Sequence, residues 1–404
     1  MDDDTPTLDS LGRMLGDPAG DGVAGVERPG EQRSALAEIG PGGFSIGEFE
    51  LARRLGVMSA TSVAEAEPTL SDDGALTTRS GQRGRPVSVI SYAAQYVSGK
   101  PYEGPVLTLL KEYPPGARRL GWSELAIAKE LQGGLPAAAD KWRVASMDPV
   151  PGLPAAPVLG YFTSVPTDEA RRIAELSGGD ASQESLWVVT KWEGLAPLQQ
   201  VLGRIKNPRP PSEAAEGVLG RWLGVGRSDG DAPWRRRWAR GVVRGALGCL
   251  AACHGKGVAH GSLCTQAVFV SEGPSERGDG RPIVRLSNLG LAPLSSAADV
   301  RAGTAQDARG MAAVVLEVAL SSLSLDGAGD RTGPEAVSRL LFDALSGDAD
   351  ALRDYMLEEP EWEPVCAWLG EGGGAGWALL GGLLGGERGV GELAGDAEEW
   401  LANE

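Results

Sequence analysis

The chain has 404 residues, with 55 acidic and 38 basic side chains and a formal net charge of −17. Nucleic acids and anionic membranes bind through basic patches, so this charge argues against both as partners. No run of about 18 apolar residues occurs, and a membrane-spanning helix is therefore not expected. Four cysteines in a chain of this size make no disulfide framework, which favours a soluble protein in a reducing intracellular compartment.

The first 85 residues are poor in aromatic side chains and rich in Gly, Asp, Glu and Ser. Such a segment cannot bury enough apolar surface to offset its conformational entropy, so residues 1–85 are predicted to be acidic and disordered. The exception is the stretch 44–55, where Leu51 and Leu55 follow two phenylalanines and predict a short amphipathic helix. This helix would pack on the main body or, less favoured, dock on a partner. The N-terminus lacks leader features, and a chloroplast location is expected only if a transit peptide has been removed.

From residue 86 the pattern changes to short runs of β-forming residues, at 87–92 and 106–113. Lys111 lies near the end of the second run. The segment between the runs, residues 93–104, contains no G-x-G-x-x-G. That motif lets backbone N–H groups approach phosphate oxygens closely, so tight nucleotide binding is not expected from this segment.

Residues 123–131 predict a helix that Ser123 could cap. Glu124 shares the face of Ile127 and Leu131 at i, i+3 and i+7, so its carboxylate points with apolar side chains rather than into water.

Further β-type runs follow at 158–162 and 186–194, and residues 195–202 predict a helix. Residues 204–233 are rich in Pro, Gly and Ser and predict an inserted loop. A long helix is expected from Trp234 to Gly255. Its first turn carries three arginines between tryptophans, but one turn in an acidic chain does not favour nucleic-acid binding.

The stretch 254–292 reads as a helix end, a polar turn and two short β-type runs, at 267–270 and 283–286. A helix follows at 307–317, and the C-terminal part is expected to form helices near 335–345, 348–357, 377–384 and 390–403. An alternative interpretation of this region is a zinc site, because five potential ligands cluster within it: Cys249, Cys253, His254, His260 and Cys264. No C-x2-C pair is present, so the zinc interpretation is less favoured.

Several of these residues, taken in order, resemble the signatures of the protein kinase-like superfamily. Lys111 resembles the lysine of V-A-I-K, and Glu124 its helix partner. His260 and Leu263 match the first and fourth positions of H-R-D-L-x-x-x-N, and Gly290 matches the glycine of D-F-G. Asp307 matches an aspartate of the large helical lobe. The resemblance covers roughly residues 86–323.

Three positions depart from the signatures. Ser262 stands where the resemblance implies the catalytic Asp, Ala267 where it implies the metal-binding Asn, and Asn288 where it implies the metal-binding Asp. The resemblance therefore implies a degenerate member, a pseudokinase, in which no residue is catalytic. Any residual nucleotide pocket would involve Lys111, Glu124 and Glu193.

The resemblance implies an α+β, bilobal kinase-like fold. Residues 86–194 are expected to form a small antiparallel-sheet N-lobe and hinge, and residues 195–404 a mainly helical C-lobe. The expected function is that of a scaffold or regulatory interaction protein with no enzymatic activity, no metal and no cofactor beyond weak Mg-independent ATP binding. The alternatives are an atypical ATP-dependent phosphotransferase, with Glu193 or Asp307 recruited to catalysis, and the zinc-stabilised interaction protein.

Overall fold

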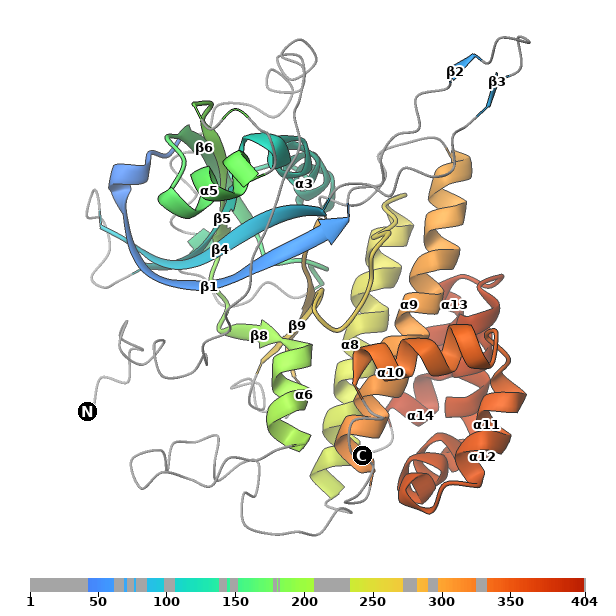
Figure 1. Ribbon diagram of the computed structural model, residues 1–404. Helices are drawn as coiled ribbons and strands as arrows, with labels where there is room; N and C mark the ends of the chain where they lie inside the picture. The colour runs from blue at the N-terminus through green and yellow to red at the C-terminus, as the bar shows by residue number, and fades with distance from the viewer. Residues whose placement is uncertain are drawn as a thin grey trace, which may run out of the picture. The chain divides into compact units, whose positions relative to one another are not determined.

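The chain divides into two compact units in the computed structural model (Figure 1). The first comprises Met1–Pro149 and Pro157–Trp192, and the second comprises Val150–Ala156 and Glu193–Glu404. The structure describes residues 43–61, 69–70, 76–77, 86–97, 106–137, 144–145, 152–176, 180, 182–206, 233–271, 282–289, 297–324 and 333–402. Of residues 1–85, which were predicted to be disordered, residues 1–42 fall outside these ranges, whereas Phe49–Thr61 form a β-strand. Most of the predicted insertion at 204–233 also falls outside these ranges.

The first unit contains a five-stranded antiparallel sheet in the order β1-β4-β5-β7-β6. The strands are β1 (Phe49–Thr61), β4 (Pro86–Tyr96), β5 (Val106–Tyr113), β6 (Val158–Ser164) and β7 (Ser185–Lys191). The helices are α3 (Arg118–Gln132) and α5 (Asp168–Leu176). Short elements complete the unit: the 3-10 turns η1 (Ile46–Glu48) and η2 (Pro115–Ala117), and the paired strands β2 (Thr69–Leu70) and β3 (Leu76–Thr77).

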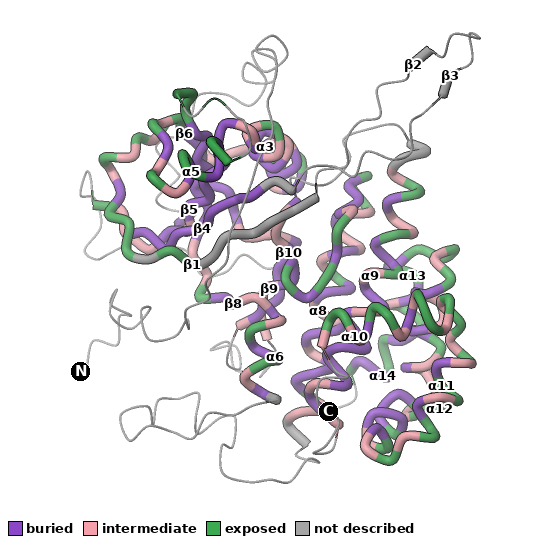
Figure 2. Tube along the Cα trace, viewed as in Figure 1, coloured by how far each residue is buried: buried purple, intermediate pink, exposed green. Residues whose placement is uncertain are grey.

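Both faces of this sheet are covered, because successive strand residues point to opposite sides. Leu110 belongs to the cluster that includes Ala170 and Ile173 of α5. Tyr113 belongs to the cluster that includes Leu125 of α3. All seven residues of β7 and five of the eight residues of β5 are buried, and Figure 2 shows buried residues along much of this sheet. The sheet is therefore a middle layer between two helices.

The helix predicted for residues 44–55 is wrong. The segment forms the turn η1 and then enters β1, which pairs with β4 along its length. Phe49 is buried and stacks on Phe162 with 5.9 Å between ring centroids, whereas Leu51 is 39% exposed. Pairing with a neighbouring strand overrides the weak helical spacing of the leucines. The sheet thus begins well before residue 86.

Helix α3 also begins earlier than expected. Its first residue is Arg118, directly after a 3-10 turn that contains Pro115. Ser123 therefore lies inside the helix and does not cap it. Proline at the start of a helical segment fixes φ near its helical value, and this signal carried more weight than the serine.

The second unit is mainly helical and contains a three-stranded antiparallel sheet in the order β10-β9-β8. Its strands are β8 (Leu195–Pro197), β9 (Val268–Ser271) and β10 (Val284–Leu286). Its helices are α6 (Leu198–Lys206), α8 (Pro233–Gly255), α9 (Ala297–Leu323), α10 (Pro334–Ser338), the π-helix η5 (Arg339–Ala344), α11 (Ala349–Leu357), η6 (Pro360–Trp362), α12 (Glu363–Gly385), α13 (Val390–Asp396) and α14 (Glu398–Ala402). The predicted α+β class is confirmed: an antiparallel sheet comes first and helices dominate afterwards.

Helix α9 is longer than the sequence indicated. It starts at Ala297, ten residues before the expected Asp307, so Asp307 lies within the helix rather than at its N-cap. Gly310 lies on the same helix, and a Cβ added there would stand 2.6 Å from the carbonyl oxygen of Leu263. This glycine lets the loop 260–267 lie directly against α9. In the described part of the chain, no helix has the length and hydropathy needed to cross a membrane.

Candidate functional site

The first unit contains a buried lysine–glutamate pair. Lys111 Nζ on β5 lies 2.6 Å from Glu124 Oε1 on α3, and the two side chains are only 5% and 8% exposed. The register of β5 aims Lys111 at the face that α3 covers, and the helical spacing of Glu124 with Ile127 aims the carboxylate back at the sheet. The pairing predicted from the sequence is therefore present.

Tyr113 completes this cluster from the same strand face, two residues beyond Lys111. Its hydroxyl donates to Glu124 Oε2, so both carboxylate oxygens have a partner. Burial raises the pKa of Tyr113, and the neighbouring Glu124 charge raises it further. The tyrosine therefore stays a neutral donor at physiological pH, and it holds the glutamate in place.

A second buried carboxylate lies on the opposite face of β5 and was not predicted from the sequence. Glu112 Oε1 accepts the backbone N–H of Thr167 (2.9 Å), and Oε2 accepts the Thr167 hydroxyl (2.7 Å). Tyr92 also donates to Oε2 at 3.2 Å. Burial raises the pKa of Glu112, partly offset by these hydrogen bonds. Since Thr167 directly precedes α5, Glu112 fixes the start of this helix on the sheet.

The segment 93–104, which contains no phosphate-binding glycine motif, lies between the second and third strands of the sheet. Residues 62–85 connect β1 to β4, the first two strands of this sheet. Residues 93–104 instead connect β4 to β5. The 62–85 connection also contains no G-x-G-x-x-G, and most of it lies outside the described residues.

The second unit is organised around Asp307, which is fully buried. Its Oδ2 accepts the backbone N–H of His260 (2.6 Å) and lies 2.9 Å from His254 Nε2. Its Oδ1 accepts the backbone N–H of Gly261 (2.7 Å). One carboxylate on α9 thus holds the backbone of the loop that follows α8.

His260 is buried and uses both ring nitrogens. Its Nε2 lies 2.7 Å from the Ser287 carbonyl oxygen, and its Nδ1 accepts the Ser262 N–H at 3.3 Å. A carbonyl oxygen can only accept, so this network assigns the ring hydrogen to Nε2. The histidine joins the loop 260–267 to the end of β10.

Ser262 and Ala267, two of the three positions that depart from the signatures, lie in the loop 260–267. The third, Asn288, directly follows Ser287, whose carbonyl oxygen His260 contacts. Ser262 is exposed, whereas Ala267 is buried and contributes its backbone to turns with Cys264 and Ser287. Asn288 has a left-handed backbone with φ of 67°, a conformation that asparagine tolerates better than most residues. Its side-chain oxygen accepts the Ser287 hydroxyl at 3.1 Å. Gly290, the other residue of this signature, lies outside the described residues.

Glu193, expected at a residual nucleotide pocket, forms a buried ion pair. Arg285 of β10 approaches its two carboxylate oxygens at 2.8 and 3.3 Å, and the glutamate side chain has no exposed area. Arg285 also donates to the Leu153 carbonyl at 3.0 Å. The pair joins Glu193, two residues before β8, to β10, and Arg285 also joins β10 to Leu153. Both Glu193 and Asp307 are thus engaged in holding the second unit together.

Glu317 is a further buried carboxyl group that the sequence did not single out. Both of its oxygens lie 3.0 Å from the Thr265 hydroxyl. Burial raises the pKa of Glu317 to about 7, against a smaller lowering by the Thr265 hydrogen bond. Near neutral pH this group is therefore partly protonated beneath the loop 260–267.

The five residues of the less favoured zinc interpretation do not converge. Across the described ranges, which include all five residues, no group of three or more His, Cys, Asp or Glu side chains is placed to hold a metal ion. Burial raises the pKa of Cys249 to about 11 and of Cys253 to about 12, so neither thiol is poised to bind metal as a thiolate. His254 is engaged with Asp307 instead.

The arginine run at the start of α8 is turned partly inward. Arg235 donates to the Ser322 carbonyl, and Arg236 pairs with Glu371 at 2.9 Å. These contacts give Arg235 and Arg236 a role within the helical unit.

Comparison with known proteins gives limited information. No protein-family model matches the chain, and neither does any curated protein. Among solved structures, the chain is similar to a crystal structure of a Stt7 homolog from Micromonas algae soaked with ATP. The identity is 15%, the match covers 76% of this chain and 87% of that chain, and the TM-score is 0.47. At that identity and TM-score no residue role is transferred to this chain.

Proposed function

We propose that this chain is a catalytically inactive protein kinase-like domain that acts as a scaffold or regulatory interaction protein. The observation that carries the proposal is that the backbone of the loop 260–267 is firmly held, whereas the side chains in and next to this loop lack catalytic groups. Asp307 and His260 hold the loop backbone through short hydrogen bonds. The positions that would carry chemistry on that backbone are Ser262, Ala267 and Asn288.

Each of these three side chains lacks the property that phosphoryl transfer requires. In kinases an aspartate accepts the proton of the substrate hydroxyl, and Asn and Asp hold the metal ions that bridge the phosphates. A serine hydroxyl is not basic near neutral pH, alanine has no ligand atom, and asparagine offers a neutral oxygen where Mg²⁺ favours carboxylate. Losing one well-placed stabilising group costs roughly two to three powers of ten in rate.

The atypical phosphotransferase is the weaker alternative. It would recruit Glu193 or Asp307 to catalysis, yet Glu193 is buried against Arg285 and Asp307 accepts two backbone N–H groups. A carboxylate that holds the fold cannot move to a substrate without breaking those contacts.

The Lys111–Glu124 pair supports a residual capacity for nucleotide. In active kinases this lysine reaches the α- and β-phosphates, and here its amine and its partner glutamate are both in place. Because no carboxylate remains at the two metal positions, any ATP binding is proposed to be weak and independent of Mg²⁺.

Thermal unfolding of the full chain with ATP, in Mg²⁺ and in EDTA, tests this proposal. The expected result is a small ATP-dependent shift of the same size in both conditions. A stabilisation that requires Mg²⁺ would show a working metal site and would overturn the inactive assignment. Co-purification from native extract tests the scaffold role, and a stable protein assembly is expected.

A further inference from the structure

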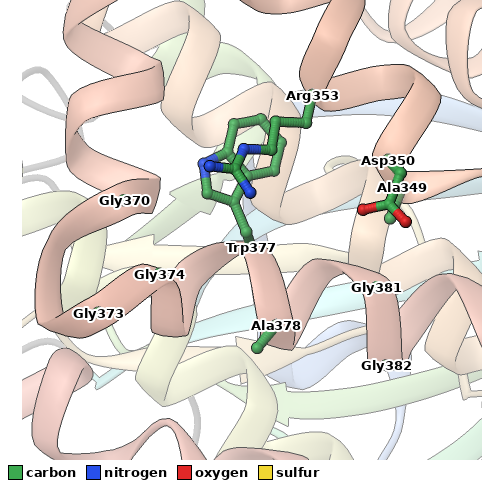
Figure 3. Close-up of a pocket in the computed structure, with 10 residues that line it drawn as sticks. All are labelled: Ala349, Asp350, Arg353, Gly370, Gly373, Gly374, Trp377, Ala378, Gly381 and Gly382. Carbon is green, nitrogen blue, oxygen red and sulfur yellow. The ribbon is translucent and has the colours of Figure 1, made fainter.

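A cavity of about 540 Å³ lies on the second unit, between the first turns of α11 and the middle of α12. Its floor is a stripe of α12 residues at spacings of three and four: Gly370, Gly373, Gly374, Trp377, Ala378, Gly381 and Gly382. Its other wall is made by Ala349, Asp350 and Arg353. Figure 3 shows Arg353 and Trp377 pointing toward one another across this space. The volume is within the range of about 300–1,000 Å³ that ligand sites occupy.

The floor of the cavity is open because the glycines carry no side chains. A Cβ added at Gly370, Gly373 or Gly374 would meet no atom within 4 Å. The stripe is not one straight helix, because the residues from Glu371 to Gly374 have non-helical backbone angles. Glycine also lets another main chain approach closely.

The shape of the floor is set by contacts to α8 rather than by a ligand. Glu371 leaves the helical conformation with ψ of 156°, and the next three residues, all glycines, have positive φ. The Glu371 carboxylate is held by Arg236 at 2.9 Å and by the buried Arg240. Two arginines of α8 thus hold the kink in α12, so the cavity has its shape before any ligand binds.

The cavity offers the groups that a peptide main chain needs. Arg353 donates hydrogen bonds and Asp350 accepts them, and both side chains are exposed. Neither forms an ion pair with another residue in the ranges that the structure describes. Trp377 is half-buried and presents an indole to a large side chain. Together these groups fit carbonyl oxygens, N–H groups and one apolar or aromatic anchor.

The segment that forms one wall of the cavity is acidic, and of its charged residues Asp350 and Arg353 line the cavity itself. Residues 343–363, which run from η5 to the start of α12, contain eight acidic residues and a single arginine. Six of the acidic residues are exposed: Asp343, Asp348, Asp350, Asp354, Glu358 and Glu363. Complementary charge steers binding partners and disfavours like-charged ones.

We propose that the cavity between α11 and α12 binds a short, extended, lysine- or arginine-rich segment of a partner protein, with one large side chain on Trp377. This site deepens the proposed scaffold role and rests on it. ATP turnover is measured separately and would contradict the proposal of an inactive domain without altering peptide binding. Failure of the proposed function and failure of the peptide site can therefore be told apart.

The test uses the full chain and a labelled peptide of five residues, a central tryptophan flanked by lysines, followed by fluorescence anisotropy. Ala378→Trp fills the cavity and is expected to raise the Kd about tenfold, the usual effect of blocking an anchor pocket. Ala367→Trp is the matched control: it adds the same side chain to an exposed position of α12 outside the cavity. Its Kd is expected to stay within about twofold of the unmodified chain.

A second peptide with glutamates in place of the lysines is expected to bind at least about tenfold more weakly. Three results would overturn the proposal. The basic peptide could fail to bind, Ala378→Trp and Ala367→Trp could have equal effects, or the acidic peptide could bind as tightly. The last result would assign the cavity to an anionic partner of Arg353. Matching thermal unfolding of the two variants confirms that both are folded.

Discussion

The two units each contain a buried cluster around a carboxylate, and the clusters differ in what the carboxylate holds. In the first unit Glu124 holds two side chains, Lys111 and Tyr113. In the second unit Asp307 holds backbone N–H groups and a histidine ring. Both clusters shape the fold of their own unit. In both clusters the carboxylate oxygens are engaged by donors of their own unit.

The largest expected effect is at Asp307. Asp307→Ala leaves the buried N–H groups of His260 and Gly261 without an acceptor, at a cost of about 4 kcal/mol of unfolding free energy. Urea unfolding of the purified chain measures it. Asp343→Ala, at an exposed carboxylate of η5, is the control and should be near neutral. A loss below about 1 kcal/mol at Asp307 would show that the loop does not depend on it.

The Lys111–Glu124 pair ranks next. Lys111→Met removes the cation and leaves Glu124 charged in a buried site, which costs about 3 kcal/mol. The double variant Lys111→Met/Glu124→Met should recover part of that loss, since no charge is then buried alone, although Tyr113 loses its acceptor. If the double variant is as unstable as the sum of the single ones, the pair is not coupled and the comparison between the clusters fails.

A third prediction concerns Glu317, which should make the free energy of unfolding depend on pH through the second unit alone. Burial raises its pKa in the folded chain to about 7, above the ordinary value near 4.3, so the folded state binds the proton more tightly than the unfolded state. The stability that this proton contributes is fully present below about pH 4 and is lost as the pH rises to about 7. Urea unfolding across that window should show a decline of up to about 3 kcal/mol that Glu317→Gln removes. An identical slope in the variant would assign the decline to other groups.

The smallest effect is expected at Ser262. Its side chain is exposed and no carboxylate or metal position depends on it. Ser262→Ala should change the free energy of unfolding by less than about 0.5 kcal/mol and leave partner binding unchanged. A larger loss in either measurement would give this hydroxyl a role that the proposed inactive loop does not include.

How far the sequence predicted these features depends on the kind of signal. Lys111 and Glu124 could be paired because strand alternation and helical spacing are local and regular. The loop frame around His260 could be placed because its spacing matches a known signature. Phe49 and its strand were missed, since pairing with β4 is a long-range contact that leaves little local trace.

The polar contacts between elements far apart in the chain could not be predicted from the sequence either. Arg285 and Glu193 are 92 residues apart, and Thr265 and Glu317 are 52 apart. No local pattern marks either partner, because burial of a charged side chain is decided by the packing of elements that the sequence does not place. The sequence therefore suggested a place for Glu193 in a nucleotide pocket, whereas in the structure its carboxylate forms a buried ion pair with Arg285.

The most direct test of the central claim is release of ADP or phosphate by the full chain incubated with ATP and Mg²⁺, with and without a general protein substrate. The account predicts no turnover above that of the heat-inactivated chain. Mg²⁺-dependent turnover that disappears in Asn288→Ala would contradict it, because Asn288 would then be holding a catalytic metal.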